Sequence, residues 1–259
     1  MELARVNGQE IAFEDTAGEG TAVLFSHGLL MDHSMFDAQV EFLRGEFRCI
    51  AWDQRGHGGT PATEPFSYWD SANDALALLD YLGVAEAVLV GMSQGGFVSL
   101  RIALQSAQRV QGLVLIDTQA GTEDVAAIPL YQALLDEWVA NGPANVEETI
   151  ASIIFGGGYD PKPWYAKWEA QPRDNLILPF RALIDRDSLV ERLGEINTPT
   201  LICHGDEDAA IPIDKARELE SNLPGARPMV IVQGAGHASN MSHPEQVNSA
   251  IQGFLRSLH

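Results

Sequence analysis

The stretch Val88-Leu-Val-Gly-Met-Ser-Gln-Gly-Gly96 decides the fold class of this chain. Its first residues are apolar and typical of a strand, and the residues that follow it have the pattern of a helix. Gly91 and Gly95 stand two residues to either side of Ser93. A tight strand-to-helix turn needs glycine there, because larger side chains would collide with the neighbouring strand and helix. The pattern predicts that Ser93 begins a helix, where backbone N–H groups stabilise negative charge, and that it is a nucleophile.

Around this turn, short apolar runs alternate with amphipathic stretches. This alternation predicts an α/β fold, with a mostly parallel eight-stranded sheet, helices on both faces and an antiparallel N-terminal hairpin at one edge. The expected strands are Leu3–Val6, Glu10–Asp15, Ala22–Phe25, Cys49–Trp52, Ala87–Val90, Gly112–Ile116, Thr200–Cys203 and Met229–Val232. The helices expected between them are Met35–Leu43, Trp69–Leu82 and Phe97–Gln105.

The alternation stops between residues 119 and 195, where the pattern predicts helices without intervening strands. These helices are Leu130–Val139, Val146–Phe155, Trp164–Trp168 and Leu178–Leu193. An insertion at the carboxyl edge of a parallel sheet lies over the place where such sheets bind ligands. We therefore expect a core domain of residues 1–118 and 196–259 and a helical cap of residues 119–195, inserted after the sixth strand.

The aromatic side chains of the expected cap are open to two interpretations. Trp138, Trp164, Tyr165 and Trp168 either line the roof of a substrate pocket or form the core of the cap's own helical bundle. For the pocket we select Trp164 and Trp168, together with His33, which precedes the first expected helix.

Composition and charge restrict the partners of the chain. Its 259 residues, 46% of them hydrophobic, suit one α/β domain with an insertion. A formal net charge of −20 disfavours nucleic acid, anionic membrane surfaces and polyanionic substrates, so we expect a neutral small molecule as the partner.

Several features predict a cytoplasmic protein. Cys49 and Cys203 each lie in an apolar run, so we expect free, buried thiols and no disulfide framework. The N-terminal residues do not have the pattern of a signal peptide, and no apolar stretch approaches membrane-spanning length.

A serine nucleophile needs a base, and the base needs an acid that orients it. The strand after the cap ends in His204-Gly-Asp-Glu-Asp208, and the final strand is followed by Gly234-Ala-Gly-His237. His237 follows small residues that let its ring reach the serine, whereas His243 precedes Pro244 and fits the start of the last helix. The order serine, aspartate, histidine predicts a catalytic triad of Ser93, His237 and either Asp206 or Asp208.

At this point the chain resembles the α/β-hydrolases, and within them the capped serine esterases, enol-lactonases and cofactor-free haloperoxidases. The resemblance extends from about Phe25 to the end of the chain. It rests on the blocks Ser26-His-Gly-Leu29, Asp53-Gln-Arg-Gly-His-Gly58, Gly91-Met-Ser-Gln-Gly95, His204-Gly-Asp-Glu-Asp208 and Gly236-His237. In this family the acid stands three residues after a glycine, which implies Asp208 and leaves Asp206 as a turn residue.

The turn carrying the nucleophile also predicts an oxyanion hole. Its two donors are the backbone N–H groups of Gln94 and of Leu29. The Gln94 side chain either touches the substrate or makes polar contacts around it. We interpret Asp53–Gly58 as a structural turn, and His27 and His57 as makers of structural hydrogen bonds.

The expected activity is that of a serine hydrolase that cleaves a small or medium carboxylic ester or lactone through an acyl-enzyme intermediate. This chemistry needs no cofactor, and no cluster of residues has the spacing of metal ligands, so we expect no metal site. Hydrolysis of carbon–carbon bonds in ring-cleavage products and a haloperoxidase or perhydrolase activity stay open as alternatives. A ligand receptor built on a hydrolase scaffold is the non-enzymatic alternative.

Overall fold

The computed structural model describes residues 1–258, in which eight strands form one sheet with the order β1-β2-β4-β3-β5-β6-β7-β8. β1 pairs antiparallel with β2 and β2 with β4, and the other neighbours are parallel. The strands are β1 (Glu2–Val6), β2 (Gln9–Asp15), β3 (Ala22–Ser26), β4 (Arg48–Trp52), β5 (Ala87–Met92), β6 (Val110–Ile116), β7 (Thr200–Gly205) and β8 (Val230–Val232). The predicted α/β fold with its antiparallel edge is confirmed.

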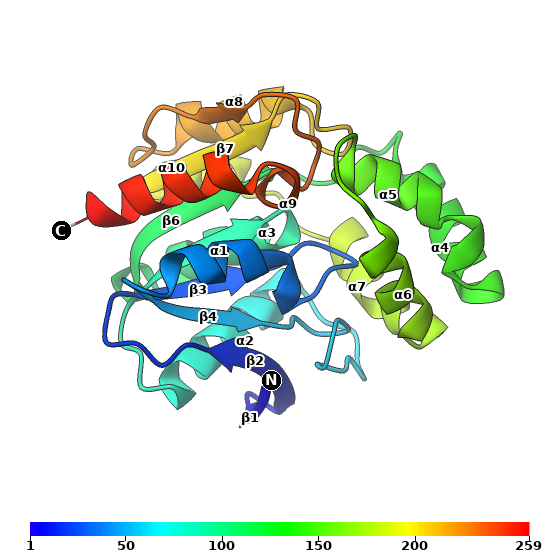
Figure 1. The fold of residues 1–259 in the computed structure, drawn as a ribbon, viewed down its shortest axis with the longest axis horizontal. Coiled ribbons are helices and arrows are strands. Elements are labelled where there is room, and N and C mark those ends of the chain that lie inside the picture. Colours follow the sequence, from blue (N-terminus) through cyan, green and yellow to red (C-terminus); the bar gives the residue numbers. More distant parts are fainter. Residues whose placement is uncertain (259) are drawn as a thin grey trace.

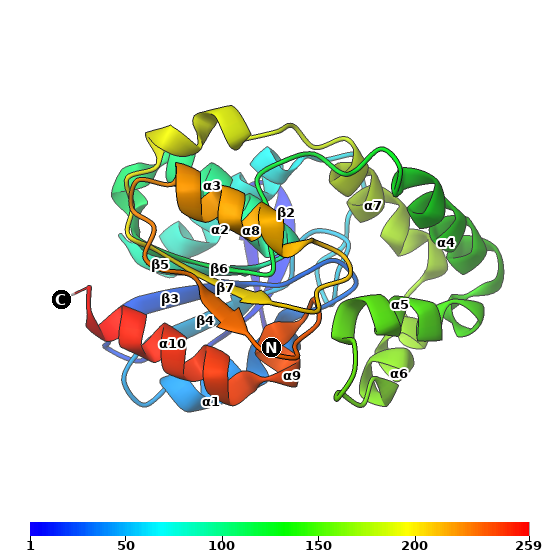
Figure 2. The same ribbon diagram turned by 90° about the horizontal axis from the view of Figure 1, so that it is seen from above.

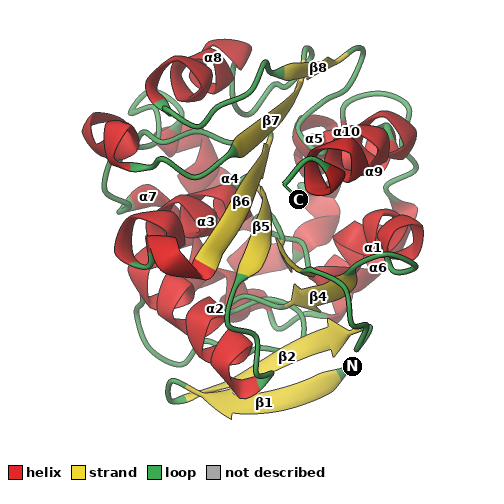
Figure 3. Cartoon of the chain, turned by 90° about the vertical axis from the view of Figure 1, so that its left-hand side faces the viewer, coloured by secondary structure: helices red, strands yellow, loops and turns green. Residues whose placement is uncertain are grey.

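Helices cover both faces of this sheet, as Figures 2 and 3 show. One face carries α2 (Tyr68–Tyr81), α3 (Gln94–Gln105) and α8 (Ile213–Asn222), and the other carries α1 (Asp37–Leu43) and α10 (Pro244–Arg256). Because the central strands are buried on both sides, β3, β5 and β7 contain continuous runs of buried residues. Short elements connect the layers: η1 (His33–Phe36), η2 (Ala107–Arg109) and α9 (Ser239–Ser242).

Residues 119–195, for which we keep the name cap, contain helices and no strand. Its elements are α4 (Ile128–Asn141), η3 (Pro143–Asn145), α5 (Glu147–Phe155), α6 (Lys162–Ala170), η4 (Arg173–Leu176), α7 (Ile177–Ile184) and η5 (Val190–Glu195). Figure 1 shows α4, α5, α6 and α7 beyond the carboxyl ends of the parallel strands, whereas η5 packs against α8 on one face of the sheet. Buried cap residues such as Trp138 and Phe155 belong to the same hydrophobic cluster as the α1 and α10 face of the sheet.

The single helix predicted over Leu178–Leu193 is wrong. The chain forms α7, leaves the helix at Asp185 and turns again in η5. Arg186 causes the interruption, because its buried guanidinium donates to the carbonyl oxygens of Gly121 and Leu183. Within residues 1–258, no helix combines the length and apolar character that a membrane crossing requires. Cys49 and Cys203 are free and buried, as predicted.

Candidate active site

Ser93 lies at the sharp turn between β5 and α3. Its backbone has a φ of 50°, in the left-handed region that side-chain-bearing residues rarely adopt. A Cβ atom on Gly91 would overlap the carbonyl oxygen of Gly95, and a Cβ on Gly95 would overlap that of Ser26. The two glycines therefore permit the close approach of β3, β5 and α3 that lifts Ser93 to the edge of the sheet.

The loops after β7 and β8 bring two further groups to this serine. His237 Nε2 lies 3.0 Å from Ser93 Oγ, and His237 Nδ1 lies 2.8 Å from Asp208 Oδ2. Asp208 Oδ1 accepts hydrogen bonds from the backbone N–H groups of Ala210 and Ile211, at 2.8 and 2.9 Å. The Asp208 carboxylate is therefore fixed through both oxygens.

The alternative acid and base lie in other places. Asp206 is a turn residue, since its Oδ1 accepts a hydrogen bond from the N–H of Gly234 at 2.6 Å. His243 is the N-cap residue of α10, the boundary position that the sequence predicts for it. The sequence-based preference for Asp208 and His237 thus agrees with the distances at Ser93.

The titration of this pair follows from its burial and its charges. Burial lowers the pKa of His237, but the charge and hydrogen bond of Asp208 outweigh burial, so this pKa lies above the ordinary value of imidazole. Burial raises the pKa of Asp208, but the charge and hydrogen bond of His237 hold it below the ordinary carboxyl value. The ionised carboxylate stabilises the imidazolium that forms when His237 takes a proton.

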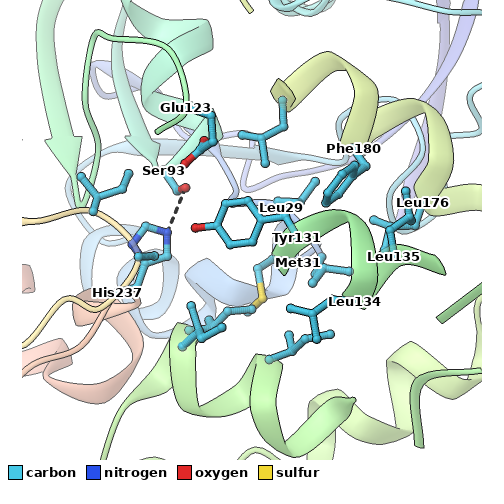
Figure 4. A pocket seen from close by; sticks show the side chains of 18 of the residues that line it. Leu29, Met31, Ser93, Glu123, Tyr131, Leu134, Leu135, Leu176, Phe180 and His237 are labelled. Atoms are coloured by element: carbon cyan, nitrogen blue, oxygen red, sulfur yellow. Dashed lines mark hydrogen bonds between the residues drawn. The ribbon is translucent and has the colours of Figure 1, made fainter. Parts of the chain in front are cut away.

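A cavity of about 900 Å³, including its open mouth, begins at Ser93 and His237 and extends under the cap. Figure 4 shows Tyr131 with its hydroxyl turned toward the Ser93 and His237 end of this pocket. The walls are mainly apolar, and most of them come from the cap. The cap residues that line it are Glu123, Tyr131, Leu134, Leu135, Trp138, Ile150, Ile153, Ile154, Leu176, Phe180 and Leu183.

The sequence and fold of this chain match those of a known protein family. A family model described as the alpha/beta hydrolase fold matches residues 21–244. The chain belongs to the α/β-hydrolase family. The predicted resemblance to this family is confirmed.

This α/β-hydrolase is similar over its length to enzymes with several named activities. It is 28% identical to 3-oxoadipate enol-lactonase 1 of Acinetobacter baylyi, over 98% of this chain and 92% of that protein. It is also 28% identical to a non-heme haloperoxidase of Rhodococcus erythropolis, over 97% of each chain. A solved structure of a thermophilic esterase from Thermogutta terrifontis aligns with a TM-score of 0.91 at 28% identity, covering both chains completely.

The two residues expected to form the oxyanion hole flank the nucleophile in this hydrolase. Gln94 is the first residue of α3, and Leu29 lies in the loop after β3 and lines the same pocket as Ser93. The Gln94 side chain is buried, and its Oε1 accepts a hydrogen bond from the Tyr68 hydroxyl at 3.3 Å. Of the two interpretations of this side chain, the structure supports interior polar contacts.

The cavity at Ser93 is lined by other residues than Trp164, Trp168 and His33, whereas the two tryptophans line a smaller cavity that shares Leu30 and Met31 with it. Trp168 packs edge-on against Trp138, with ring centroids 6.0 Å apart, and the Trp164 indole N–H is bonded to the Tyr159 hydroxyl. Both tryptophans are buried in the cap, as the alternative interpretation holds. His33 is held away from the pocket because its Nδ1 lies 2.7 Å from Asp53 Oδ1.

The Asp53–Gly58 segment forms the structural turn that its sequence predicts. Asp53 Oδ1 accepts a hydrogen bond from the N–H of His33, and Oδ2 accepts one from Gly59. Nε2 of His27 accepts a hydrogen bond from the N–H of Gln54 at 2.9 Å. These bonds join the loops after β3 and β4.

Asp117 is a residue of this site that the sequence analysis missed. Its Oδ1 accepts a hydrogen bond from the N–H of Gly205 at 2.8 Å, and its Oδ2 accepts one from Ser239 at 2.9 Å. It thereby ties the loop that carries Asp208 to the loop that carries His237. Burial raises the pKa of Asp117 to about 6. Its signal in the sequence is a carboxylate directly after the apolar strand that ends at Ile116.

Asp117, His204 and Asp208 are the side chains of this site that come closest to a metal-binding group, with ligand atoms within 4.8 Å of one another. His204 Nε2 lies 2.9 Å from the carbonyl oxygen of Ile211. All four carboxylate oxygens already accept hydrogen bonds, from Gly205, Ser239, Ala210, Ile211 and His237. The group fits an internal network that orients the triad loops better than it fits an ion.

A second missed feature is the buried ion pair of Glu123 and Arg186. Arg186 Nη1 lies 2.7 Å from Glu123 Oε2. The side chain of Arg186 is 1% exposed and that of Glu123 is 9% exposed. Glu123 lines the pocket, whereas the guanidinium lies behind it over the ring of Phe97. The charged group that faces the pocket is therefore a carboxylate whose charge is already compensated.

Proposed function

We propose that this α/β-hydrolase cleaves neutral carboxylic esters or lactones of small or medium size through an acyl-enzyme on Ser93. The observation that carries the proposal is the continuous chain from Ser93 Oγ through His237 to Asp208, which faces a largely apolar cavity.

In this mechanism, His237 Nε2 accepts the hydroxyl proton while Ser93 Oγ attacks the carbonyl carbon. The N–H groups of Leu29 and Gln94 donate hydrogen bonds to the oxyanion. His237 then protonates the departing alkoxide, which leaves as an alcohol or stays tethered to the acyl group when the substrate is a lactone. Water, deprotonated by His237, attacks the acyl-enzyme and releases the acid.

The pocket supports a neutral substrate. Within residues 1–258, its walls are mainly apolar and include no lysine or arginine, and Arg186, which lies behind Glu123, is already paired with it, so the pocket offers no free cation to a substrate carboxylate. We further propose that residues 119–195 act as a cap that selects the acyl group. The free, buried thiols of Cys49 and Cys203 are compatible with the predicted cytoplasmic location.

A peroxide-dependent activity is a second candidate, because a non-heme haloperoxidase is among the relatives at 28% identity. The same acyl-enzyme would form, and hydrogen peroxide would replace water as the attacking group. The product would then be a peracid in place of the acid.

The test is labelling of the purified protein with a fluorophosphonate, followed by kinetics with a p-nitrophenyl ester, a γ-lactone, a vinylogous diketone, and acetate with peroxide. We expect labelling at Ser93 and multiple turnovers with the ester or the lactone. Labelling that persists in Ser93→Ala contradicts the proposal. Turnover of the diketone only, or formation of peracid from acetate and peroxide only, would assign one of the other activities, and tight binding without turnover would assign a receptor.

A further inference from the structure

The loop that carries Leu29 contains an unusual turn. The N–H of Met31 donates to the carbonyl oxygen of Gly28 at 3.2 Å, and Leu30, the third residue of this turn, has a φ of 67°. Turns with a positive φ at this position strongly prefer glycine or asparagine. A leucine there is strained, and such strain persists only where the surroundings hold it in place.

Trp168 of the cap supplies such a hold. Its indole Nε1–H donates to the carbonyl oxygen of Leu30 at 2.8 Å. Trp168 is 2% exposed and packs against the rings of Trp138, Phe155 and Tyr165. Because the indole has a single polar donor and these rings fix its orientation, its N–H points at one place on the core.

Lys167, the residue before Trp168 in α6, binds the same loop at Asp32 and Ser34, after Met31. Its Nζ donates to Asp32 Oδ2 at 2.8 Å and to Ser34 Oγ at 2.5 Å. Burial alone would raise the pKa of Asp32, but the hydrogen bonds from Lys167 and Ser34 hold it below its ordinary value, so the carboxylate stays ionised. Two adjacent cap residues thus hold the loop on both sides of Met31.

We propose that Trp168 is a positioning residue. Through it, the direction of the Leu29 N–H in the oxyanion hole depends on how the cap packs against the core. The inference rests on the proposed function. The Leu30 carbonyl that accepts from the indole shares a peptide group with the Met31 N–H, and the Gly28 carbonyl that accepts from Met31 shares one with the Leu29 N–H. Without the indole hydrogen bond, Leu30 is free to relax out of its left-handed conformation, and the rotation reaches the Leu29 N–H through the bond between Met31 and Gly28. The cap then contributes to the transition state as well as to the choice of substrate.

The kinetic signature of this role differs from that of a binding role. An oxyanion donor interacts more strongly with the tetrahedral transition state than with the substrate, so its displacement lowers kcat and leaves KM nearly unchanged. Outright loss of such a donor lowers kcat by about 10²–10³-fold. A donor that is misdirected but present should lower it by a smaller factor, on the order of tenfold.

The experiment compares Trp168→Phe with Trp164→Phe. Both residues belong to α6 and are nearly as buried, at 2% and 4% exposure, and each variant loses one indole N–H. The Trp164 N–H is bonded within the cap, to the Tyr159 hydroxyl at 3.3 Å. The measurements are kcat and KM for an ester and the inhibition constant of a trifluoromethyl ketone, which adds to the serine and places its oxyanion in the hole.

We expect Trp168→Phe to lower kcat and the affinity for the ketone by the same factor of about ten, with KM unchanged, and Trp164→Phe to change neither more than about twofold. Equal behaviour of the two variants overturns the inference. So does a rise in KM at constant kcat, which would mean that Trp168 only shapes the pocket.

Leu30→Gly separates the strain from the hydrogen bond. Glycine adopts a φ of 67° without steric cost, so adding Leu30→Gly to Trp168→Phe should restore kcat at least threefold, and failure to restore it rejects the role of strain. If Trp168→Phe unfolds, Lys167→Met takes its place, since the Lys167 side chain is 40% exposed, and kcat should fall about threefold at constant KM. Wild-type labelling and turnover test the proposed function separately.

Discussion

The carboxyl edge of the sheet and the cap place their side chains by different physical means. At the edge, Ser93 follows β5, Asp208 follows β7 and His237 follows β8, and hydrogen bonds between the strands fix where each loop begins. In the cap, each helix presents several faces, and only packing decides which face meets the pocket. A position at the end of a strand can therefore be read from sequence, whereas the orientation of an inserted helix cannot.

The strongest test of the site at the carboxyl edge is removal of the proposed nucleophile. Ser93→Ala should lower kcat by about 10⁴-fold or more, because it removes the hydroxyl that attacks the substrate in the proposed mechanism. Steady-state hydrolysis of an activated ester measures the loss. Ser99→Ala is the matched control in α3, since the Ser99 hydroxyl only donates to the carbonyl oxygen of Gly95, and it should stay within about twofold. Ester hydrolysis by Ser93→Ala at the wild-type rate would refute the assignment.

Asp117→Asn tests whether activity depends on the hydrogen bonds by which Asp117 joins the loops after β7 and β8. The amide group would point an N–H at the backbone N–H of Gly205 or Ser239, so one hydrogen bond is lost. We expect kcat to fall about 10–100-fold through misplacement of the triad. The free energy of unfolding in urea should fall by about 1–3 kcal/mol.

Asp206→Asn is the control for this change, because Asp206 also accepts a backbone N–H but lies on the exposed side of the turn. It should lower kcat less than about threefold. Equal losses of kcat in the two variants would mean that Asp117 contributes to stability and not to the placement of the triad.

The pH dependence tests the electrostatics of the edge. His237 must be neutral to accept the serine proton, so kcat/KM should fall about tenfold per pH unit below its pKa. Because Asp208 raises this pKa, the acidic limb should lie above the ordinary imidazole value. Asp208→Asn removes that charge and should shift the limb to lower pH. A limb that does not move in this variant would show that another group controls it.

The smallest expected effect concerns the cap. Leu134→Trp narrows the pocket from α4 and should raise KM for a long-chain ester about tenfold while sparing an acetate. Leu130→Trp, on an exposed face of the same helix, should leave both unchanged. Similar effects of the two substitutions would contradict the orientation of α4 and weaken the contrast between the cap and the edge.

Sequence patterns predicted most of the fold and the polar groups that meet at Ser93. They failed at Leu178–Leu193, because the buried contacts of Arg186 end the helix, and these contacts involve residues more than 60 positions away. Asp117 was missed for a related reason. Its partners Gly205 and Ser239 are separated from it by 88 and 122 positions, so no local pattern reveals them.

By itself, the sequence determined the order of the strands along the chain, the glycines that permit the turn at Ser93, and the two loops that supply an aspartate and His237. These follow from local sterics and from the way parallel strands end at one edge. The preference for Asp208 over Asp206 came from the resemblance to the family. Only the tertiary structure decided that Tyr131 and Leu134 line the cavity at Ser93, and that the Trp168 indole donates to the carbonyl oxygen of Leu30. The reason is that both outcomes depend on how the cap rotates and packs against the core, an interaction between segments more than 100 residues apart.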